Sequence, residues 1–105
     1  MSKERRENQR LPVEFDAVLN YQQHAIICTV RDISLNGAFV ETMPDSLPTR
    51  NTHVEIGFSV LTNGQNRYLR IPGRIAYIKD NGAGVRFSEV GMDAYMNLVD
   101  MVYEA

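Results

Sequence analysis

The sequence is poor in residues that build covalent or metal-linked scaffolds. Its 105 residues include one cysteine, two histidines and no tryptophan. The single cysteine, Cys28, cannot form an internal disulfide. His24 and His53 are isolated and lack the neighbouring ligands of a metal site. We therefore expect no disulfide, no metal site and no bound cofactor.

Long apolar runs are also missing. No stretch approaches the roughly 20 apolar residues that a helix needs to cross a bilayer. The first residues, Met1 to Glu7, are polar and charged, unlike the apolar region of a secretory signal. Together with the unpaired cysteine, this pattern predicts a cytoplasmic protein without membrane insertion, and its length predicts one domain.

The charge is unevenly distributed along the chain. The formal net charge is −2 and the isoelectric point is about 5.6, which disfavours general electrostatic binding to nucleic acid. Residues 1–10 hold four basic side chains against two glutamates, whereas residues 89–105 hold four acidic side chains and no lysine or arginine. A cationic start and an acidic end indicate a local anion site rather than a basic surface.

Alternating apolar and polar residues predict a chain of short strands. Residues 1–10 have no apolar side chain after Met1 and are expected to form a flexible arm, with order beginning at residue 11. The period of two typical of half-buried strands then recurs along the chain. Strands are expected at 13–21, 25–31, 38–41, 54–60, 69–77 and 84–87, with turn signals between them. Within the fifth strand, Pro72 and Gly73 predict a bulge or an edge.

The period changes to that of a helix near the C-terminus, and we expect a helix over residues 91–104. Its apolar face is predicted to hold Met92, Tyr95, Met96, Val99, Val102 and Tyr103, opposite Asp93, Asn97, Asp100 and Glu104. Six strands followed by one helix predict a mainly β domain over residues 11–105, as an antiparallel barrel or a sandwich with the helix packed on it.

Two short motifs carry residues suited to binding an anionic guanine nucleotide. The first is R-x-x-x-R from Arg6 to Arg10, preceded by Arg5, and the second is D-x-S-x-x-G from Asp32 to Gly37. Guanidinium groups match phosphate oxygens and stack on bases, and arginine is the commonest specific partner of guanine O6 and N7. A carboxylate suits the donors of the guanine Watson–Crick edge, and a glycine permits close approach of backbone and ligand.

Each motif alone has a simpler explanation. Arginines in a polar arm are usually solvated, and Asp32, Ser34 and the Asn36-Gly37 pair are typical turn residues, the last pair with positive φ in many hairpins. The occurrence of both motifs in this order, arm and then first hairpin, favours a ligand site.

With these motifs, the sequence resembles the PilZ family of bacterial receptors for cyclic di-GMP. The resemblance covers nearly the whole chain and includes Ala38-Phe39-Val40 and Gly84-Val-Arg-Phe87. It implies a six-stranded antiparallel β-barrel with a C-terminal α-helix. It also implies that Arg6 and Arg10 clamp the ligand, that Asp32 and Ser34 hold a guanine, and that Gly37 gives steric room.

Two further roles follow from the resemblance. Arg5 would stack on a second guanine, because the family accepts either one ligand or an intercalated pair, and we favour the pair. Tyr77 would cover a guanine face, although its alternation with Ile75 is equally consistent with a core position. The ligand would order the arm and alter contacts with an unidentified protein partner.

Other function classes remain as alternatives. The sequence contains no nucleophile–base pair, metal spacing or paired catalytic carboxylates, so we do not expect an enzyme. A small barrel that binds single-stranded nucleic acid predicts a broad basic surface, which the acidic isoelectric point disfavours. A protein-interaction domain without any small ligand is the other alternative. The regulated process, the affinity and the oligomeric state are not specified by the sequence.

Overall fold

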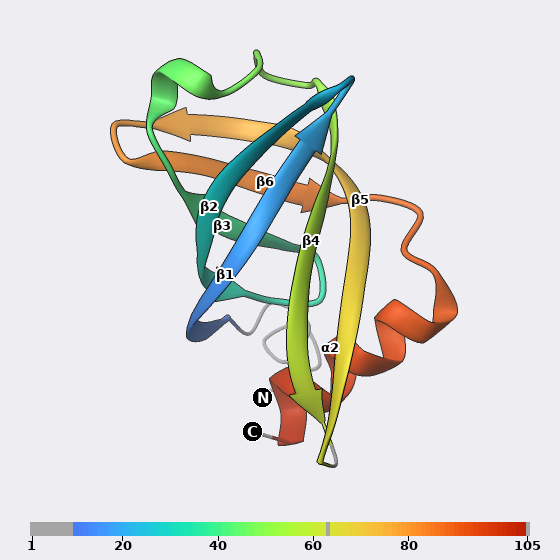
Figure 1. The fold of residues 1–105 in the computed structure, drawn as a ribbon. Coiled ribbons are helices and arrows are strands. Elements are labelled where there is room, and N and C mark those ends of the chain that lie inside the picture. The colour runs from blue at the N-terminus through green and yellow to red at the C-terminus, as the bar shows by residue number, and fades with distance from the viewer. Residues whose placement is uncertain (1–9, 63, 105) are drawn as a thin grey trace, which may run out of the picture.

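The computed structural model describes residues 10–62 and 64–104, which form a closed antiparallel barrel of six strands and a C-terminal helix (Figure 1). The strands follow the order β1-β2-β3-β6-β5-β4 around the barrel. Their bounds are β1 Leu11–Tyr21, β2 His24–Ile33, β3 Gly37–Glu41, β4 His53–Thr62, β5 Gln65–Lys79 and β6 Gly82–Phe87. A short 3-10 helix, η1 (Pro44–Ser46), follows β3, and α2 spans Met92–Glu104. The predicted strands and the barrel are thus confirmed, and the sandwich is excluded.

Strand β5 is long and pairs with a different neighbour along each of its two parts. It has 15 residues, and its pairing with β4 runs from Gln65 to Arg74. Its pairing with β6 runs from Gly73 to Lys79. In Figure 1, β1 and β4 cross in front of β6.

The barrel interior is filled by the inward residues of the alternating strands. Phe58, Leu19, Ile56 and Ile71 are among the largest side chains that are fully buried. Phe15 is partly buried and packs against this core, where it stacks on Phe58 with 5.6 Å between ring centroids. At about 25 cal/mol for each Å² of apolar surface, such burial is the main source of stability.

The irregularity predicted at Pro72 and Gly73 lies elsewhere. Pro72 pairs with Glu55 in regular register, and the shift in β5 falls between Ile75 and Tyr77, leaving Ala76 as the extra residue. Because the barrel is closed, β5 is not an edge strand. Pro72 has no N–H to donate to the sheet, and its carbonyl oxygen accepts the N–H of Ser88 at 2.9 Å.

The helix packs on the barrel through a face that matches the predicted one only in part. Leu98 and Val102 are buried, and Ala94 and Met101 pack against the core. Met92, Tyr95 and Met96 are exposed instead. Figure 1 places α2 beside the ends of β4 and β5 that meet at their shared turn. The prediction is confirmed for Val102 and wrong for Met92, Tyr95 and Met96, because it omitted Leu98 and Met101, which complete a second apolar face.

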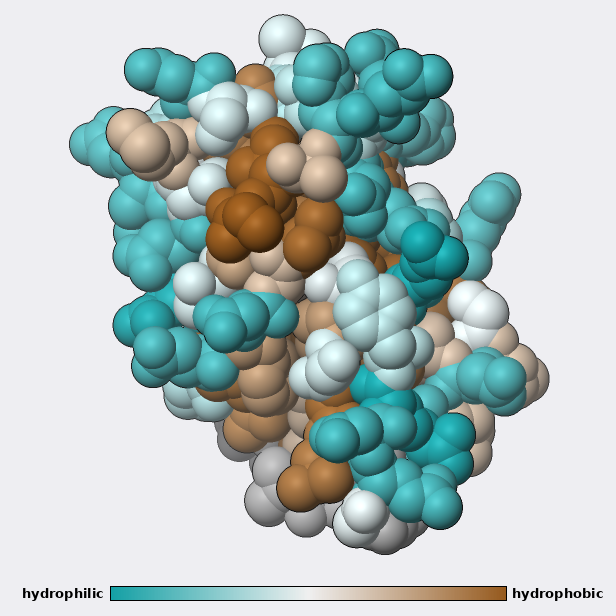
Figure 2. Space-filling model, viewed as in Figure 1, coloured by the Kyte–Doolittle hydropathy of each residue, from teal (hydrophilic) through white to brown (hydrophobic). Residues whose placement is uncertain are grey.

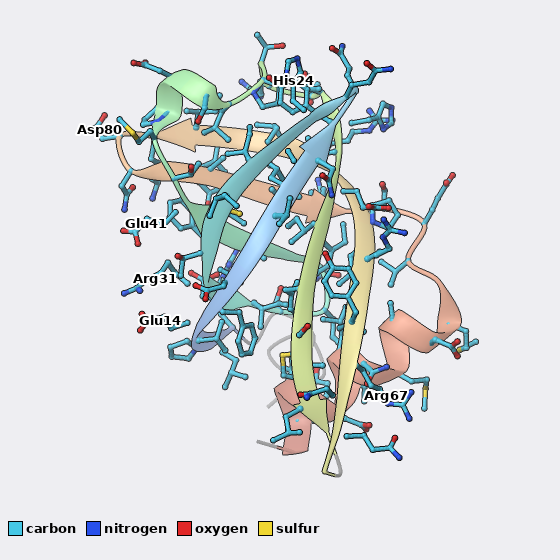
Figure 3. The ribbon with its side chains drawn as sticks, viewed as in Figure 1. Glu14, His24, Arg31, Glu41, Arg67 and Asp80 are labelled. Carbon is cyan, nitrogen blue, oxygen red and sulfur yellow. The ribbon has the colours of Figure 1, made fainter. Side chains whose placement is uncertain are left out.

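The face of the barrel seen in Figures 2 and 3 carries an apolar area and a charged cluster. Apolar surface gathers over β1 and β2 (Figure 2), where Ile27 faces Val18 across the strand pair and is 77% exposed. Figure 3 shows Arg31 beside Glu14 and Glu41, and their ion-pair distances are 3.7 and 3.8 Å. In the described residues, no helix is both long and apolar enough to cross a membrane.

Burial of Cys28 couples stability to alkaline pH. Its side chain lies in the barrel core, and burial raises the pKa of the thiol from 9.0 to about 11. The unfolded chain therefore loses this proton at a lower pH than the folded chain, so stability falls as pH rises from 9.0 towards 11. The full contribution is on the order of 2–3 kcal/mol.

Urea unfolding at several pH values tests this prediction, with Cys28→Ala as the reference. Other titrating groups affect both proteins equally, so the difference between their unfolding free energies isolates the thiol. That difference should shrink between pH 9.0 and 11. A difference that is constant over this range would contradict the coupling.

Candidate functional site

Strand register brings the end of the arm to the second motif. In the β1–β2 pair, Pro12 faces Asp32 and Leu11 faces Ile33. Arg10, immediately before β1, therefore lies beside Asp32, and its guanidinium Nη1 forms an ion pair with the Asp32 carboxylate. Both side chains are partly exposed, so the pair contributes little to stability, about 0–1 kcal/mol. Two motif residues that are 22 positions apart in the sequence thus meet at one point.

Ser34 builds the turn that follows β2. Its hydroxyl accepts the backbone N–H of Asn36 at 3.2 Å and of Gly37 at 3.3 Å, and donates to the Gly37 carbonyl at 3.3 Å. A serine hydroxyl has one donor and two acceptor sites, so these bonds use its full capacity. The Ser34 side chain is buried, and its observed role is to hold the turn.

Position 37 requires glycine because the backbones of β3 and β6 lie close together there. It pairs with Arg86 across β3 and β6, and a Cβ atom at this position would lie 2.4 Å from the carbonyl oxygen of Val85. Neither Asn36 nor Gly37 has a positive φ. The glycine therefore permits close packing of strands and not the left-handed hairpin turn considered from the sequence.

The bulge at Ala76 turns Tyr77 to the outside of the barrel. Ile75 is buried, whereas Tyr77 is 39% exposed, so the shared alternation expected from the sequence is broken by the extra residue. The tyrosine ring covers Gly84, where a Cβ atom would lie 2.3 Å from ring carbons. It also stacks near Phe39, with 6.4 Å between centroids, and Lys79 Nζ lies 5.4 Å from its centroid. The ring is thereby held flat on the outer surface.

These elements border a hollow of about 320 Å³ on the outer surface of β3, β6 and β5. This volume is at the lower end of the range for ligand sites. Its lining residues are Arg10, Ser34, Asn36, Gly37, Ala38, Ala76, Tyr77, Gly84, Val85 and Arg86. Four predicted site residues are thus brought together, and Asp32 joins them through its ion pair with Arg10. Arg5 and Arg6 lie outside the described residues.

Sequence reasoning did not include Arg86 among the site residues, although it lines the hollow. The Arg86 side chain is exposed and lines the hollow. The residue that pairs with it on β3 is Gly37, which has no side chain to cover Arg86. The available signal was the alternation of β6, which places Gly84 and Arg86 on one face. Among the described residues, no group of three or more His, Cys, Asp or Glu side chains could hold a metal ion.

The fold and the hollow define a class of small β-barrel with a polar, arginine-bordered surface site next to the turn after β2. The PilZ domain model matches residues 4–104. The chain therefore belongs to the PilZ domain family. No curated protein matches the sequence.

Two solved structures are similar to this fold. The Bacillus subtilis inhibitor of motility, MotI/DgrA, has a TM-score of 0.81 at 12% identity, covering 91% of this chain and 48% of that one. The chain thus spans about half the length of that protein. The PilZ domain of CeSA from a cellulose-synthesizing bacterium has a TM-score of 0.72 at 16% identity, covering 92% of this chain and 97% of that one. At these identities the similarity concerns the fold alone.

Proposed function

We propose that this chain is a bacterial, cytoplasmic receptor domain for cyclic di-GMP, with a binding rather than a catalytic role. The observation that carries the proposal is the meeting of Arg10 and Asp32 at the rim of a hollow lined by Ser34, Gly37 and Tyr77. Membership of the PilZ family, whose members include cyclic di-GMP receptors, supports the same ligand.

In this proposal each of the two motifs binds a different part of the ligand. Arg6 and Arg10 bind phosphate and guanine, with Arg5 next to them, and Asp32 accepts the N–H donors of a guanine edge. The ion pair with Arg10 has to rearrange as the guanine enters, because the same carboxylate oxygen is occupied. Ser34 contributes by fixing the turn. Gly37 contributes by keeping the floor of the hollow close to β6.

Binding would also order the arm, residues 1–10, over the hollow. The arm carries four basic side chains, so its movement onto the barrel changes the charge of this face. A protein partner that senses this face would then respond to the ligand. The number of bound ligands, one or an intercalated pair, determines how many residues of the arm contact the ligand.

Calorimetric titration with cyclic di-GMP, and with cyclic di-AMP as the matched control, tests the proposal. We expect saturable binding of the guanine ligand that persists at elevated salt, because base recognition adds to the charge attraction. The stoichiometry distinguishes one ligand from a pair. Equal binding of both dinucleotides, or binding that salt abolishes, would indicate a nucleic-acid-type surface instead. No heat from a folded sample would indicate a domain that only contacts proteins.

Tyr77 provides a finer prediction at the same site. Its exposed ring offers a stacking surface for a base, and such stacking is worth about 1–3 kcal/mol. Tyr77→Ala should therefore weaken cyclic di-GMP binding about tenfold, whereas Tyr77→Phe keeps the ring and should bind like the wild type. If Tyr77→Ala binds normally, the ring only shields Gly84 and β6.

A further inference from the structure

A row of basic side chains crosses the outside of the barrel next to the hollow. Arg86 on β6 faces Arg74 on β5 in the antiparallel register, and Arg74 faces His53 on β4. All three residues are exposed. Directly opposed residues on one face have Cβ atoms about 5 Å apart, so the two guanidinium groups share one small area.

The loop before β4 adds a third arginine to this row. Asn51 donates its N–H to the carbonyl of Ile75 at 2.8 Å, and Ile75 donates its own N–H to the carbonyl of Thr52 at 3.1 Å. These bonds fasten the loop to β5 beside Arg74. Arg50, Arg74 and Arg86 thereby line a second hollow of about 470 Å³.

No carboxylate neutralises these three arginines within residues 10–62 and 64–104. The ion pairs in this part of the chain engage Arg10, Arg31 and Arg70 instead. Like charges that face each other across a strand pair destabilise it, and the cost falls when an anion binds between them. Arginine forks match phosphate oxygens with paired hydrogen bonds.

The second hollow adjoins the first. Both are lined by Ala76 and Arg86, so Arg86 stands on the ridge between them. A ligand with two phosphate groups can therefore contact both. The bulge at Ala76 forms part of this shared ridge.

We propose that Arg50, Arg74 and Arg86 form a second phosphate-binding subsite, which holds a phosphodiester group of a nucleotide bound at the first hollow. The identity of that nucleotide rests on the proposed function, but the anion site itself does not. The subsite extends the ligand contacts from the arm and the turn after β2 to β5 and the loop before β4.

Arg74→Ala is the most informative variant, because Arg74 lines the second hollow and not the first. The control is Arg67→Ala, which removes an exposed arginine from the same strand near α2, away from this row (Figure 3). Cyclic di-GMP affinity should fall about tenfold in Arg74→Ala, the effect of losing one charged hydrogen-bond partner. It should stay within about twofold of the wild type in Arg67→Ala, and Arg74→Lys should fall between them.

Inorganic pyrophosphate provides a test that does not depend on the dinucleotide. In the wild type, the arginine side-chain NMR signals of Arg50, Arg74 and Arg86 should shift saturably with pyrophosphate, while that of Arg67 stays constant. If these signals shift but cyclic di-GMP does not bind the chain, the proposed function fails and the anion site stands.

Two results would overturn the subsite. One is the absence of saturable shifts at the three arginines. The other is unchanged cyclic di-GMP affinity in Arg74→Ala. In that case the three arginines would instead fit an acidic surface of a protein partner.

The same substitution has an expected effect on stability. Because it removes a like-charge contact, Arg74→Ala should unfold at a urea concentration no lower than that of the wild type in phosphate-free buffer.

Discussion

Asp32→Ala is expected to abolish most cyclic di-GMP binding, with a loss of about 100-fold or more. A carboxylate that accepts two N–H donors of guanine forms charge-assisted bonds worth about 1.5–3 kcal/mol each, and each 1.4 kcal/mol corresponds to a factor of about ten. Calorimetric titration measures the loss. Asp32→Asn keeps the shape but removes the charge and replaces an acceptor with a donor, so it should also bind weakly.

Asp16→Ala is the matched control for Asp32→Ala. Asp16 is an exposed aspartate on the outside of β1, at the side of the barrel away from the site hollow. Its removal should leave affinity within about threefold of the wild type. The Arg10–Asp32 ion pair is partly exposed and contributes little to folding, so circular dichroism should show all variants folded. Normal binding by folded Asp32→Ala would refute the assigned role of this carboxylate.

Gly37→Ala is expected to destabilise the barrel by about 2–4 kcal/mol. The added Cβ would lie 2.4 Å from the Val85 carbonyl oxygen, and because that atom belongs to the backbone of β6, the strands must separate to admit it. The loss should be seen as a lower urea midpoint with an unchanged slope.

Gly91→Ala is the control for this effect, because a Cβ at Gly91 meets nothing within 4 Å. Gly91 precedes α2 and its carbonyl oxygen accepts the N–H of Tyr95, so the change should cost no more than about 1 kcal/mol, the loss expected for alanine in place of glycine at an N-cap. A Gly37→Ala variant as stable as Gly91→Ala would mean that β3 and β6 can move apart at little cost, and that the glycine is there for the ligand alone.

Much of the fold was predictable because the barrel strands obey simple periodicity. Residues 13–21 and 54–60 alternate regularly, and the observed strands β1 and β4 contain both ranges. The helix begins at Met92, one residue from the predicted start. Closure into a barrel could not be derived from alternation, because a sandwich has the same local pattern; it came from the family resemblance.

The errors arose where tertiary contacts override local pattern. Ala76 carries no sequence signal for a bulge, whereas Pro72 and Gly73 do, yet the shift occurs at Ala76. The helix has two overlapping apolar faces, and only contact with the barrel selects the one with Leu98. Periodicity alone cannot decide between such faces.

The candidate site was predictable in its motifs but not in its geometry. The order of the two motifs along the chain suggested a common ligand, and strand register brings Arg10 and Asp32 into contact. Arg74 and Arg86 are 12 positions apart, and their pairing depends on the β5–β6 register. Nothing in the linear sequence places Arg50 beside them.

The closed strand order has a consequence for how partners are recognised. Every strand of the barrel has a hydrogen-bonded neighbour on both sides, but the pairing does not run the whole length of each strand. Strand β5 pairs with β6 only from Gly73 onward, and β1 pairs with β4 only from Ala17 to Asn20. Residues 65–72 of β5 and 11–16 of β1 therefore have one side outside the barrel ladder, and these are the stretches where a partner strand can add by β-augmentation. Elsewhere on the barrel a partner has to recognise side chains.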